Sequence, residues 1–204
     1  MLYHEREARK KKYSFIIGVD EAGRGPLAGP VVVAAVYLKR YSFSARVDDS
    51  KKLTPLMREK AFKEISGSGF YGVGIINEGA IDTIRITKAI GAATDIAIGA
   101  LIKRAEHFKP TLKNTFLLFD GTLSSSFKYS SKEIIGGDGK SISIAAASIV
   151  AKVARDRIMD VYNRVWPEYG FGRHKGYGTG EHIRNIRRYG LCPIHRRTFC
   201  EAIF

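Results

Sequence analysis

Four acidic residues stand at positions where they could bind a divalent metal together. These residues are Asp20, Glu21, Asp120 and Asp138. The first two directly follow the apolar run 15–19, the third ends the run 116–119, and the fourth lies between two glycines. Burying neighbouring carboxylates is costly unless cations offset their charge, and carboxylate oxygens suit Mg²⁺ and Mn²⁺. The pattern predicts a shared metal site, with separate solvated turns as the alternative.

The elements around these acids must bring them to one edge of a sheet. In open α/β sheets, sites form beyond the carboxyl ends of strands, where distant parts of the chain converge. Strand alternation would point Asp20 and Glu21 to opposite faces. We therefore expect the first strand to end between them, because Gly23 and Gly25 allow a sharp turn that brings Glu21 back toward Asp20.

Apolar patterning predicts an α/β domain with a mixed sheet. The expected strands cover residues 15–19, 30–38 and 70–76, followed by one that ends at Asp120 and one near Ile135. The expected helices cover residues 55–65, 83–107, 141–165 and 181–189. The order of the strands stays open, because periodicity does not determine it.

Composition predicts one compact domain over residues 1–204 that acts on a polyanion. The chain is 45% hydrophobic and carries a net charge of +14, although the predicted site is acidic. A basic surface attracts phosphate backbones, while a local carboxylate cluster holds the metal. Basic residues gather in residues 1–13, where we expect a flexible arm, and in residues 173–197. The alternative is that these charges serve only solubility.

The chain shows neither a bilayer-spanning apolar stretch nor a secretion signal, so we expect a cytoplasmic protein without membrane contact. Its two cysteines, Cys192 and Cys200, lack metal-binding spacing and favour reduced thiols. A zinc site with His195 is the weaker alternative.

Motifs spread over nearly the whole chain resemble those of type 2 ribonuclease H (ribonuclease HII). They are DEAGRGP at 20–26, DSKKL at 49–53, FDG at 119–121, GDGKSISIAAASIVAKVARD at 137–156, HKGYGT at 174–179 and HRRTF at 195–199. The resemblance implies a ribonuclease H-like fold, with a mixed sheet of about five strands flanked by helices. A helical C-terminal portion, about residues 157–204, would close one side of the substrate groove.

The resemblance also implies the activity. Asp20, Glu21, Asp120 and Asp138 match the catalytic and metal-binding carboxylates of the family, which hold two Mg²⁺ or Mn²⁺ ions. The implied substrates are RNA–DNA hybrids and duplex DNA that contains ribonucleotides. The enzyme would cut the RNA strand, or cut 5′ to a single ribonucleotide, and leave 5′-phosphate and 3′-hydroxyl ends.

Substrate contacts follow from the same resemblance. Gly23, Arg24 and Gly25 would recognise the 2′-hydroxyl, and Tyr177 would stack on the following deoxyribose. The residues assigned to phosphates are Ser50, Lys51, Lys52, His174 and Lys175. Alternatives remain: Arg24 could pair with a carboxylate, Tyr177 could be a packing residue, and the loop after Asp49 could lead into a helix capped by Thr54.

Other polar residues beside the motifs have structural interpretations. We expect His182, His195 and Arg196 to be structural or to contact the backbone, and Asp48, Asp49 and Asp156 to form ion pairs. The rival functions are a type 3 ribonuclease H and a catalytically silent nucleic-acid-binding module. We expect a monomer, and the terminal Ile203-Phe204 is not a convincing sliding-clamp docking peptide.

Overall fold

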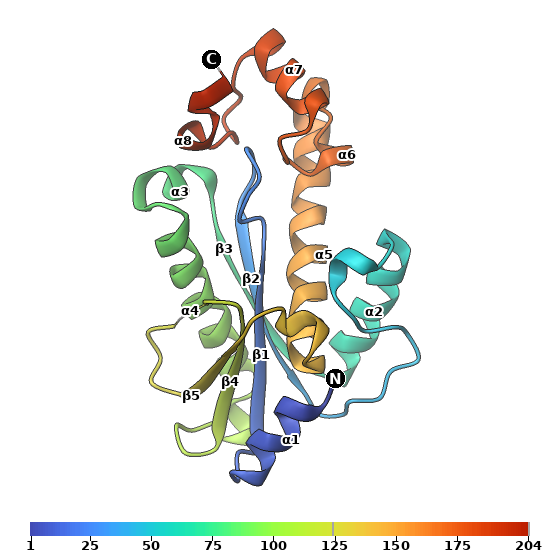
Figure 1. Ribbon diagram of the computed structural model, residues 1–204, viewed down its shortest axis with the longest axis vertical. Helices are drawn as coiled ribbons and strands as arrows, with labels where there is room; N and C mark the ends of the chain where they lie inside the picture. Colours follow the sequence, from blue (N-terminus) through green and yellow to red (C-terminus); the bar gives the residue numbers. More distant parts are fainter. Residues whose placement is uncertain (124, 204) are drawn as a thin grey trace.

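A mixed β-sheet forms the centre of the protein in a computed structural model that describes residues 1–123 and 125–203 (Figure 1). In this part of the chain the strands pair in the order β3-β2-β1-β4-β5. The pairs β3–β2 and β2–β1 are antiparallel, whereas the pairs β1–β4 and β4–β5 are parallel. The strands are β1 (Phe15–Ala22), β2 (Val31–Leu38), β3 (Gly69–Ile76), β4 (Thr115–Asp120) and β5 (Ser130–Ile134). The predicted mixed five-stranded sheet is confirmed.

Helices cover both faces of the sheet (Figure 1). On one face α4 packs its alanine-rich and isoleucine-rich side against β2 and β3, and on the other face α5 packs against β1 and β2. The helices are α1 (Tyr3–Lys10), α2 (Pro55–Ser68), α3 (Glu78–Ile84), α4 (Ile86–Arg104), α5 (Ile142–Val165), α6 (Phe171–His174), α7 (Gly180–Tyr189) and α8 (Arg197–Cys200). The Thr54 side chain caps α2, as in the alternative interpretation of the loop after Asp49, and accepts a hydrogen bond from the backbone N–H of Met57.

The helix predicted over residues 83–107 is observed as α4 (Ile86–Arg104), and its first two predicted residues belong instead to the end of α3. Arg85 has a positive φ of 70°, so helical geometry stops there even though its N–H still bonds Ile81. The second helix, α4, then ends at Arg104, before a short 3₁₀ turn (Glu106–Phe108). The apolar residues at helical spacing, from Ile86 to Leu101, all lie within α4, so the helix is confirmed and only its two ends differ from the prediction.

The prediction of a flexible arm over residues 1–13 is wrong, because residues 3–10 form the packed helix α1. Its Glu5 is fully buried and accepts hydrogen bonds from Ser141 Oγ at 2.6 Å and from the backbone N–H of Ser143 at 3.0 Å. A carboxylate at the N-terminus of α5 is stabilised by the helix dipole. The basic residues around Glu5 face solvent, and their charge concealed the buried side of the helix.

Strand β1 and helix α5 touch through their backbones at Gly18. A Cβ atom there would overlap the carbonyl group of Ser143, so glycine is required for this approach. The contact fixes the start of α5 against the middle of β1. It therefore fixes the loop before α5 relative to the strand ends.

The C-terminal helices lie beyond one end of the sheet, around the end of α5 (Figure 1). They have a small apolar core, in which Tyr169, Phe171 and Ile194 pack with Met159 of α5 and Ala28 of the loop after β1. This confirms the predicted helical C-terminal portion. Ile203 ends the last 3₁₀ turn (Glu201–Ile203), and Phe204 lies outside the described residues.

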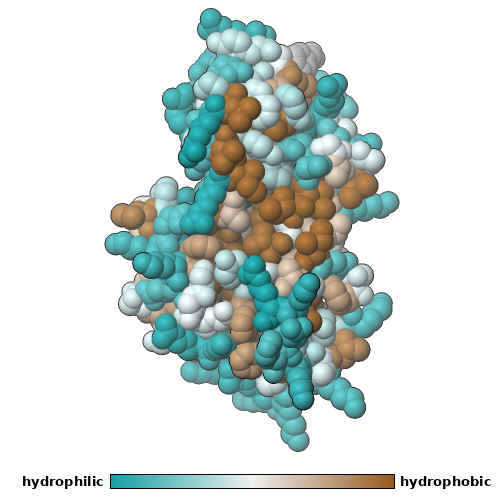
Figure 2. Space-filling view, turned by 180° about the vertical axis from the view of Figure 1, so that it is seen from behind, coloured by the Kyte–Doolittle hydropathy of each residue, from teal (hydrophilic) through white to brown (hydrophobic). Residues whose placement is uncertain are grey.

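The reverse face of the molecule has hydrophobic residues across its middle and hydrophilic residues around them (Figure 2). Strand β3 is an edge strand of the sheet, and its Ile75 is about half exposed. Among the described residues, no helix combines the length and apolar character needed to cross a membrane.

Candidate active site

Three of the four predicted carboxylates meet beyond the parallel strands. Asp20 of β1, Asp120 at the end of β4 and Asp138 in the 3₁₀ turn η3 (Gly137–Gly139) each offer an oxygen atom, and these atoms lie within 4.8 Å of one another. The register explains the first pair, because Val19 faces Phe119 in the parallel ladder and the two aspartates come next. Three distant segments thus form one acidic group.

Glu21 is not part of this group of three, because β1 does not end where we predicted. The strand continues to Ala22, and its pairing with Val32 to Ala34 of β2 holds Asp20 and Glu21 in extended geometry. The Glu21 carboxylate forms an ion pair of 3.6 Å with Arg24. Pairing with a carboxylate was the alternative role considered for Arg24, and the structure contains this ion pair.

Burial and the nearby carboxylates disfavour the charged forms of Asp20 and Asp138. Burial raises the pKa of Asp20 well above its usual value, and the nearby Glu21 and Asp120 raise it further. Burial also raises the pKa of Asp138, with further contributions from Asp49 and Asp120. A divalent cation would offset this repulsion, and an all-oxygen donor set suits Mg²⁺ or Mn²⁺. The residues present therefore fit the implied metal.

Hydrogen bonds and charges tie the loops of the site together. Asp120 Oδ1 accepts a hydrogen bond of 2.6 Å from the backbone N–H of Gly137, so β4 positions the turn that carries Asp138. Lys51 Nζ lies 4.0 Å from Asp138 Oδ2. Although burial lowers the pKa of Lys51, Asp138 and the other site carboxylates give a net increase. Lys51 thus partly balances the acidic group.

The glycine turn after β1 is held by two buried arginines. Gly23 has a φ of +92°, as predicted, while Gly25 does not need a positive φ. Arg196 donates hydrogen bonds to the carbonyl groups of Gly23 at 2.6 Å, Arg24 at 3.0 Å and Gly29 at 2.9 Å. Arg196 was expected to be structural or to contact the backbone, and these bonds to carbonyl groups of the protein show the structural role.

Arg155 of α5 holds the next part of the same loop. It donates hydrogen bonds to the carbonyl oxygens of Ala28 at 3.0 Å and Pro30 at 2.9 Å. Its Nη1 donates to the carbonyl oxygen of Lys175 at 2.9 Å. Arg155 thereby joins the glycine loop to the loop before Tyr177. Sequence reasoning missed Arg155, although it lies within the motif at 137–156.

A hollow of about 140 Å³ brings together most of the predicted substrate-binding residues. Ser148 and Lys152 of α5 also line it, and sequence reasoning missed both. The i, i+4 spacing of Ser148 and Lys152, followed by the i, i+3 spacing of Lys152 and Arg155, was the available signal for one helix face. The lining residues are Glu21, Ala22, Gly23, Arg24, Gly25, Ser50, Lys51, Ser148, Lys152 and Tyr177.

Tyr177 lies at the hollow with 44% of its surface exposed. A chain of hydrogen bonds holds its backbone: the N–H of Cys192 donates to His195 Nδ1, the Nε2 atoms of His195 and His182 lie 3.1 Å apart, and His182 Nδ1 lies 2.9 Å from the Tyr177 carbonyl oxygen. With the Cys192 N–H as the first donor, both rings are neutral. His195 Nε2 then carries the proton that it donates to His182 Nε2, and His182 Nδ1 carries the proton that it donates to the Tyr177 carbonyl oxygen. The structural role predicted for these histidines is confirmed.

Three predicted phosphate contacts do not line this hollow. Lys52 forms an ion pair with Asp48. The ring of His174 is buried, with Nδ1 accepting from Gly176 N–H and Nε2 bonded to the Tyr169 carbonyl oxygen. His174 thus lacks a free nitrogen for a phosphate, and its role is to shape the loop before Tyr177. Lys175 pairs with Asp160 and lines a different cleft.

The ion pairs predicted for the acids beside the motifs are present for Asp48 and Asp156. Asp48 pairs with Arg46, and Asp156 pairs with Lys152 and Arg58, as ion pairs. Asp49 differs in part, because its carboxylate accepts from the N–H of Lys51 and caps the 3₁₀ turn η1 (Ser50–Lys52). Both cysteines are free and buried.

Comparisons with known proteins agree with this geometry. A sequence model of the family described as ribonuclease HII matches residues 17–202. Ribonuclease HII of Acetivibrio thermocellus is 48% identical over 202 residues, which cover 98% of this chain and 75% of that protein. Ribonuclease HII of Caldanaerobacter subterraneus is 45% identical over 204 residues, which cover 100% and 81%.

Solved structures show the same fold. Ribonuclease H2 of Pyrococcus horikoshii superimposes with a TM-score of 0.74 at 25% identity, covering 93% of this chain and 96% of that one. A type 3 enzyme, Bst-RNase HIII solved with Mn²⁺, gives 0.67 at 21% identity, covering 90% and 65%. The fold is thus common to both types, and the sequence match distinguishes them. The chain belongs to the ribonuclease HII family of metal-dependent nucleases, which act on RNA–DNA hybrids.

Proposed function

We propose that this enzyme cuts on the 5′ side of single ribonucleotides embedded in duplex DNA, as well as within the RNA strand of RNA–DNA hybrids. The observation that carries the proposal is the hollow that the glycine turn and Tyr177 share with Glu21, the neighbour of Asp20 in β1. A 2′-hydroxyl distinguishes RNA from DNA, and a glycine turn lets the backbone approach a sugar closely. Recognition and hydrolysis would thus occur side by side.

The carboxylates Asp20, Asp120 and Asp138 would hold the metal, with Glu21 completing the set from the next position of β1. We propose two Mg²⁺ or Mn²⁺ ions, a choice supported by the all-oxygen donor set and by the Mn²⁺ complex of the type 3 relative. When bound, two such ions activate the attacking water and stabilise the leaving 3′ oxygen, which gives 5′-phosphate and 3′-hydroxyl ends.

The other residues would position the substrate. The backbone of Gly23 to Gly25 contacts the 2′-hydroxyl, and Arg196 keeps that turn rigid by binding its carbonyl groups. The exposed ring of Tyr177 stacks on the deoxyribose that follows the ribonucleotide. Ser50 and Lys51 reach the phosphate near the acidic group.

Cleavage of a DNA duplex with one embedded ribonucleotide tests the proposal. We expect a single metal-dependent cut 5′ to the ribonucleotide, a 3′-hydroxyl end, and no cut in chelator. Asp20→Asn should lower the rate by about a thousandfold or more, equivalent to roughly 4 kcal/mol, while duplex binding persists. The matched control is Glu106→Gln, an exposed acid in the turn after α4. Cleavage of long hybrids alone would favour type 3 specificity, and no cleavage of either substrate would favour a binding module.

We also propose that the protein acts as a monomer in the cytoplasm. The basic charge of the chain and its two free cysteines support contact with nucleic acid in a reducing compartment. Size-exclusion chromatography with light scattering tests the oligomeric state, and a mass twice that of the chain would contradict the proposal.

A further inference from the structure

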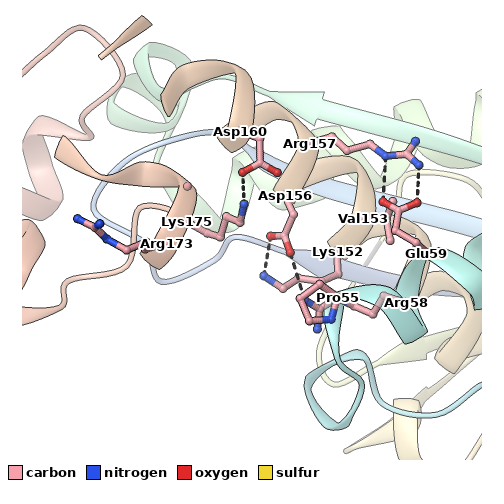
Figure 3. Close-up of a pocket in the computed structure, with 11 residues that line it drawn as sticks. Pro55, Arg58, Glu59, Lys152, Val153, Asp156, Arg157, Asp160, Arg173 and Lys175 are labelled. Carbon is pink, nitrogen blue, oxygen red and sulfur yellow. Dashed lines mark hydrogen bonds and ion pairs between the residues drawn. The ribbon is translucent and has the colours of Figure 1, made fainter. Parts of the chain in front are cut away.

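A second cleft, of about 330 Å³, lies between α2, α5 and the loop after α6 (Figure 3). Charged side chains from all three segments point into it. Arg58 comes from α2, Lys152 and Asp156 come from α5, and Lys175 comes from the loop before Tyr177. None of the functions described above uses this cleft.

On the α5 side of the cleft, positive charges outnumber the negative charges that pair with them. Arg58 and Lys152 share a single carboxylate, that of Asp156, at 3.5 Å and 2.6 Å. All three side chains are largely buried, with exposed fractions of 12%, 20% and 15%. Among the described residues, one positive charge in this poorly solvated setting therefore has no carboxylate of its own.

The other acids of the cleft are already paired. Asp160 pairs with Lys175, and Glu59 pairs with Arg157 at 2.7 Å (Figure 3). These carboxylates are therefore committed to their own cations. Burial lowers the pKa of Lys152 despite its contact with Asp156, as expected for a cation that lacks sufficient negative charge. An incoming anion would supply that charge.

The cleft adjoins the candidate active site. Lys152 lines both this cleft and the smaller hollow that contains Gly23 and Tyr177. Lys175, on the opposite side of the cleft, precedes Tyr177 by two residues, and its carbonyl oxygen is held by Arg155. A strand whose sugar stacks on Tyr177 would therefore continue past Lys152.

We propose that this cleft binds a phosphodiester group of the DNA that follows the ribonucleotide, with Lys152 as its direct ligand. Arg58 would contribute positive charge without binding the phosphate directly, because its Nη1 already donates hydrogen bonds to the carbonyl oxygens of Ser50 and Leu53. The assignment rests on the proposed function, which sets the path of the strand. The phosphate would sit beside the site and take no part in the hydrolysis.

Neutral phosphate analogues test the assignment directly. In chelator, fluorescence anisotropy measures binding of duplexes in which one phosphate at a time, 3′ to the ribonucleotide, is a methylphosphonate. In the wild-type protein, one position should weaken binding about tenfold, which is roughly 1.4 kcal/mol. In Lys152→Met the same replacement should have little further effect, and the slope of log K against log salt should fall by about one.

Two further variants keep the test decisive. Lys152→Arg keeps the charge and should restore sensitivity to that position, even if Lys152→Met proves unstable. Lys113→Met, an exposed lysine before β4, should bind slightly more weakly with every duplex and keep the wild-type profile. Identical profiles for Lys152→Met and the wild type would overturn the assignment, as would equal losses at all positions.

The source of the anion and the proposed function are tested separately. If inorganic phosphate shifts the NMR signal of Lys152 while no methylphosphonate position matters, the cleft is a free-anion site and the assignment is wrong. Failure of the wild-type protein to cut embedded ribonucleotides would contradict the proposed function instead. Binding in chelator is independent of that result.

Discussion

Arg196 Nη2 donates a hydrogen bond of 2.6 Å to the carbonyl oxygen of Gly23, across 173 positions of the chain. The guanidinium group is fully buried and binds carbonyl groups, while burial lowers its pKa to about 10. The Glu78 carboxylate, at the start of α3, contributes a compensating charge. The C-terminal portion thus holds the turn that would recognise the ribose.

Replacing Arg196 should impair recognition more than chemistry. Arg196→Lys keeps the charge but cannot reach three carbonyl groups, so we expect the kcat/KM for an embedded ribonucleotide to fall by roughly 10-fold to 100-fold. The metal concentration for half-maximal activity should stay unchanged. A matched control is Arg187→Lys on α7. If Arg196→Lys only lowered the unfolding temperature and left discrimination between ribose and deoxyribose intact, its role would be structural alone.

The acidic group should destabilise the protein when no metal is bound. Because the folded-state pKa of Asp20 is raised, the folded protein loses stability relative to the unfolded chain as pH rises above the usual aspartate value. Asp20→Asn removes that charge, so in chelator at pH 8 the variant should melt above the wild type. Each 1 kcal/mol corresponds to roughly 2–4 °C for a domain of this size.

Mn²⁺ should reverse that order, since it stabilises only a protein that can bind it. Differential scanning fluorimetry with chelator and with Mn²⁺ measures both effects. A wild-type melting temperature that does not respond to Mn²⁺, or an Asp20→Asn variant that melts below the wild type in chelator, would contradict this account of the site.

Tyr177 should matter most at a lone ribonucleotide. Its exposed ring lies at the hollow beside the glycine turn, and a nucleic-acid base stacked on an aromatic side chain contributes about 1–3 kcal/mol, which sets an upper range for a sugar. Tyr177→Ala should therefore reduce cleavage at an embedded ribonucleotide by about 10-fold to 100-fold, and cleavage of a long hybrid less. Tyr177→Phe keeps the ring and should retain most of the activity. Equal losses with both substrates would exclude the junction role.

The histidine chain behind Tyr177 should make stability depend on pH. Burial lowers the pKa of His182 and of His195 from 6.5 to about 4. Between these values the unfolded chain binds more protons, so the free energy of unfolding should fall as pH decreases from 6.5 to 4. Each histidine contributes up to roughly 3 kcal/mol. His174, flanked by Arg173 and Glu181, belongs to the same cluster.

Urea denaturation at several pH values checks this dependence. His182→Gln can still donate to the Tyr177 carbonyl group but does not titrate, so its stability should vary less between pH 6.5 and 4 than that of the wild type. The matched control His107→Gln, in the exposed turn after α4, should follow the wild type. Parallel curves for His182→Gln and the wild type would show that the chain does not govern the acid response.

Local sequence patterns predicted the strands and the three converging aspartates, because each acid directly follows an apolar run or a glycine. They failed at Glu21, since the pairing of β1 with β2 that prolongs the strand is a long-range contact. They also failed for Arg155, because a buried arginine and a surface arginine look alike in a chain with 34 basic residues. Burial by distant segments likewise decided the role of His174.

Helix α5 starts four residues after Asp138, carries Lys152 and Arg155, and ends among the C-terminal helices. Its 24 residues span about 36 Å. Inserting one residue in the middle of α5 would turn every later position by about 100° and move Arg155 away from the loop carbonyl groups. Helix α5 thus fixes both the distance and the rotation between the acidic group and the side chains that face the substrate. Changes of chain length between relatives should therefore accumulate in the loops.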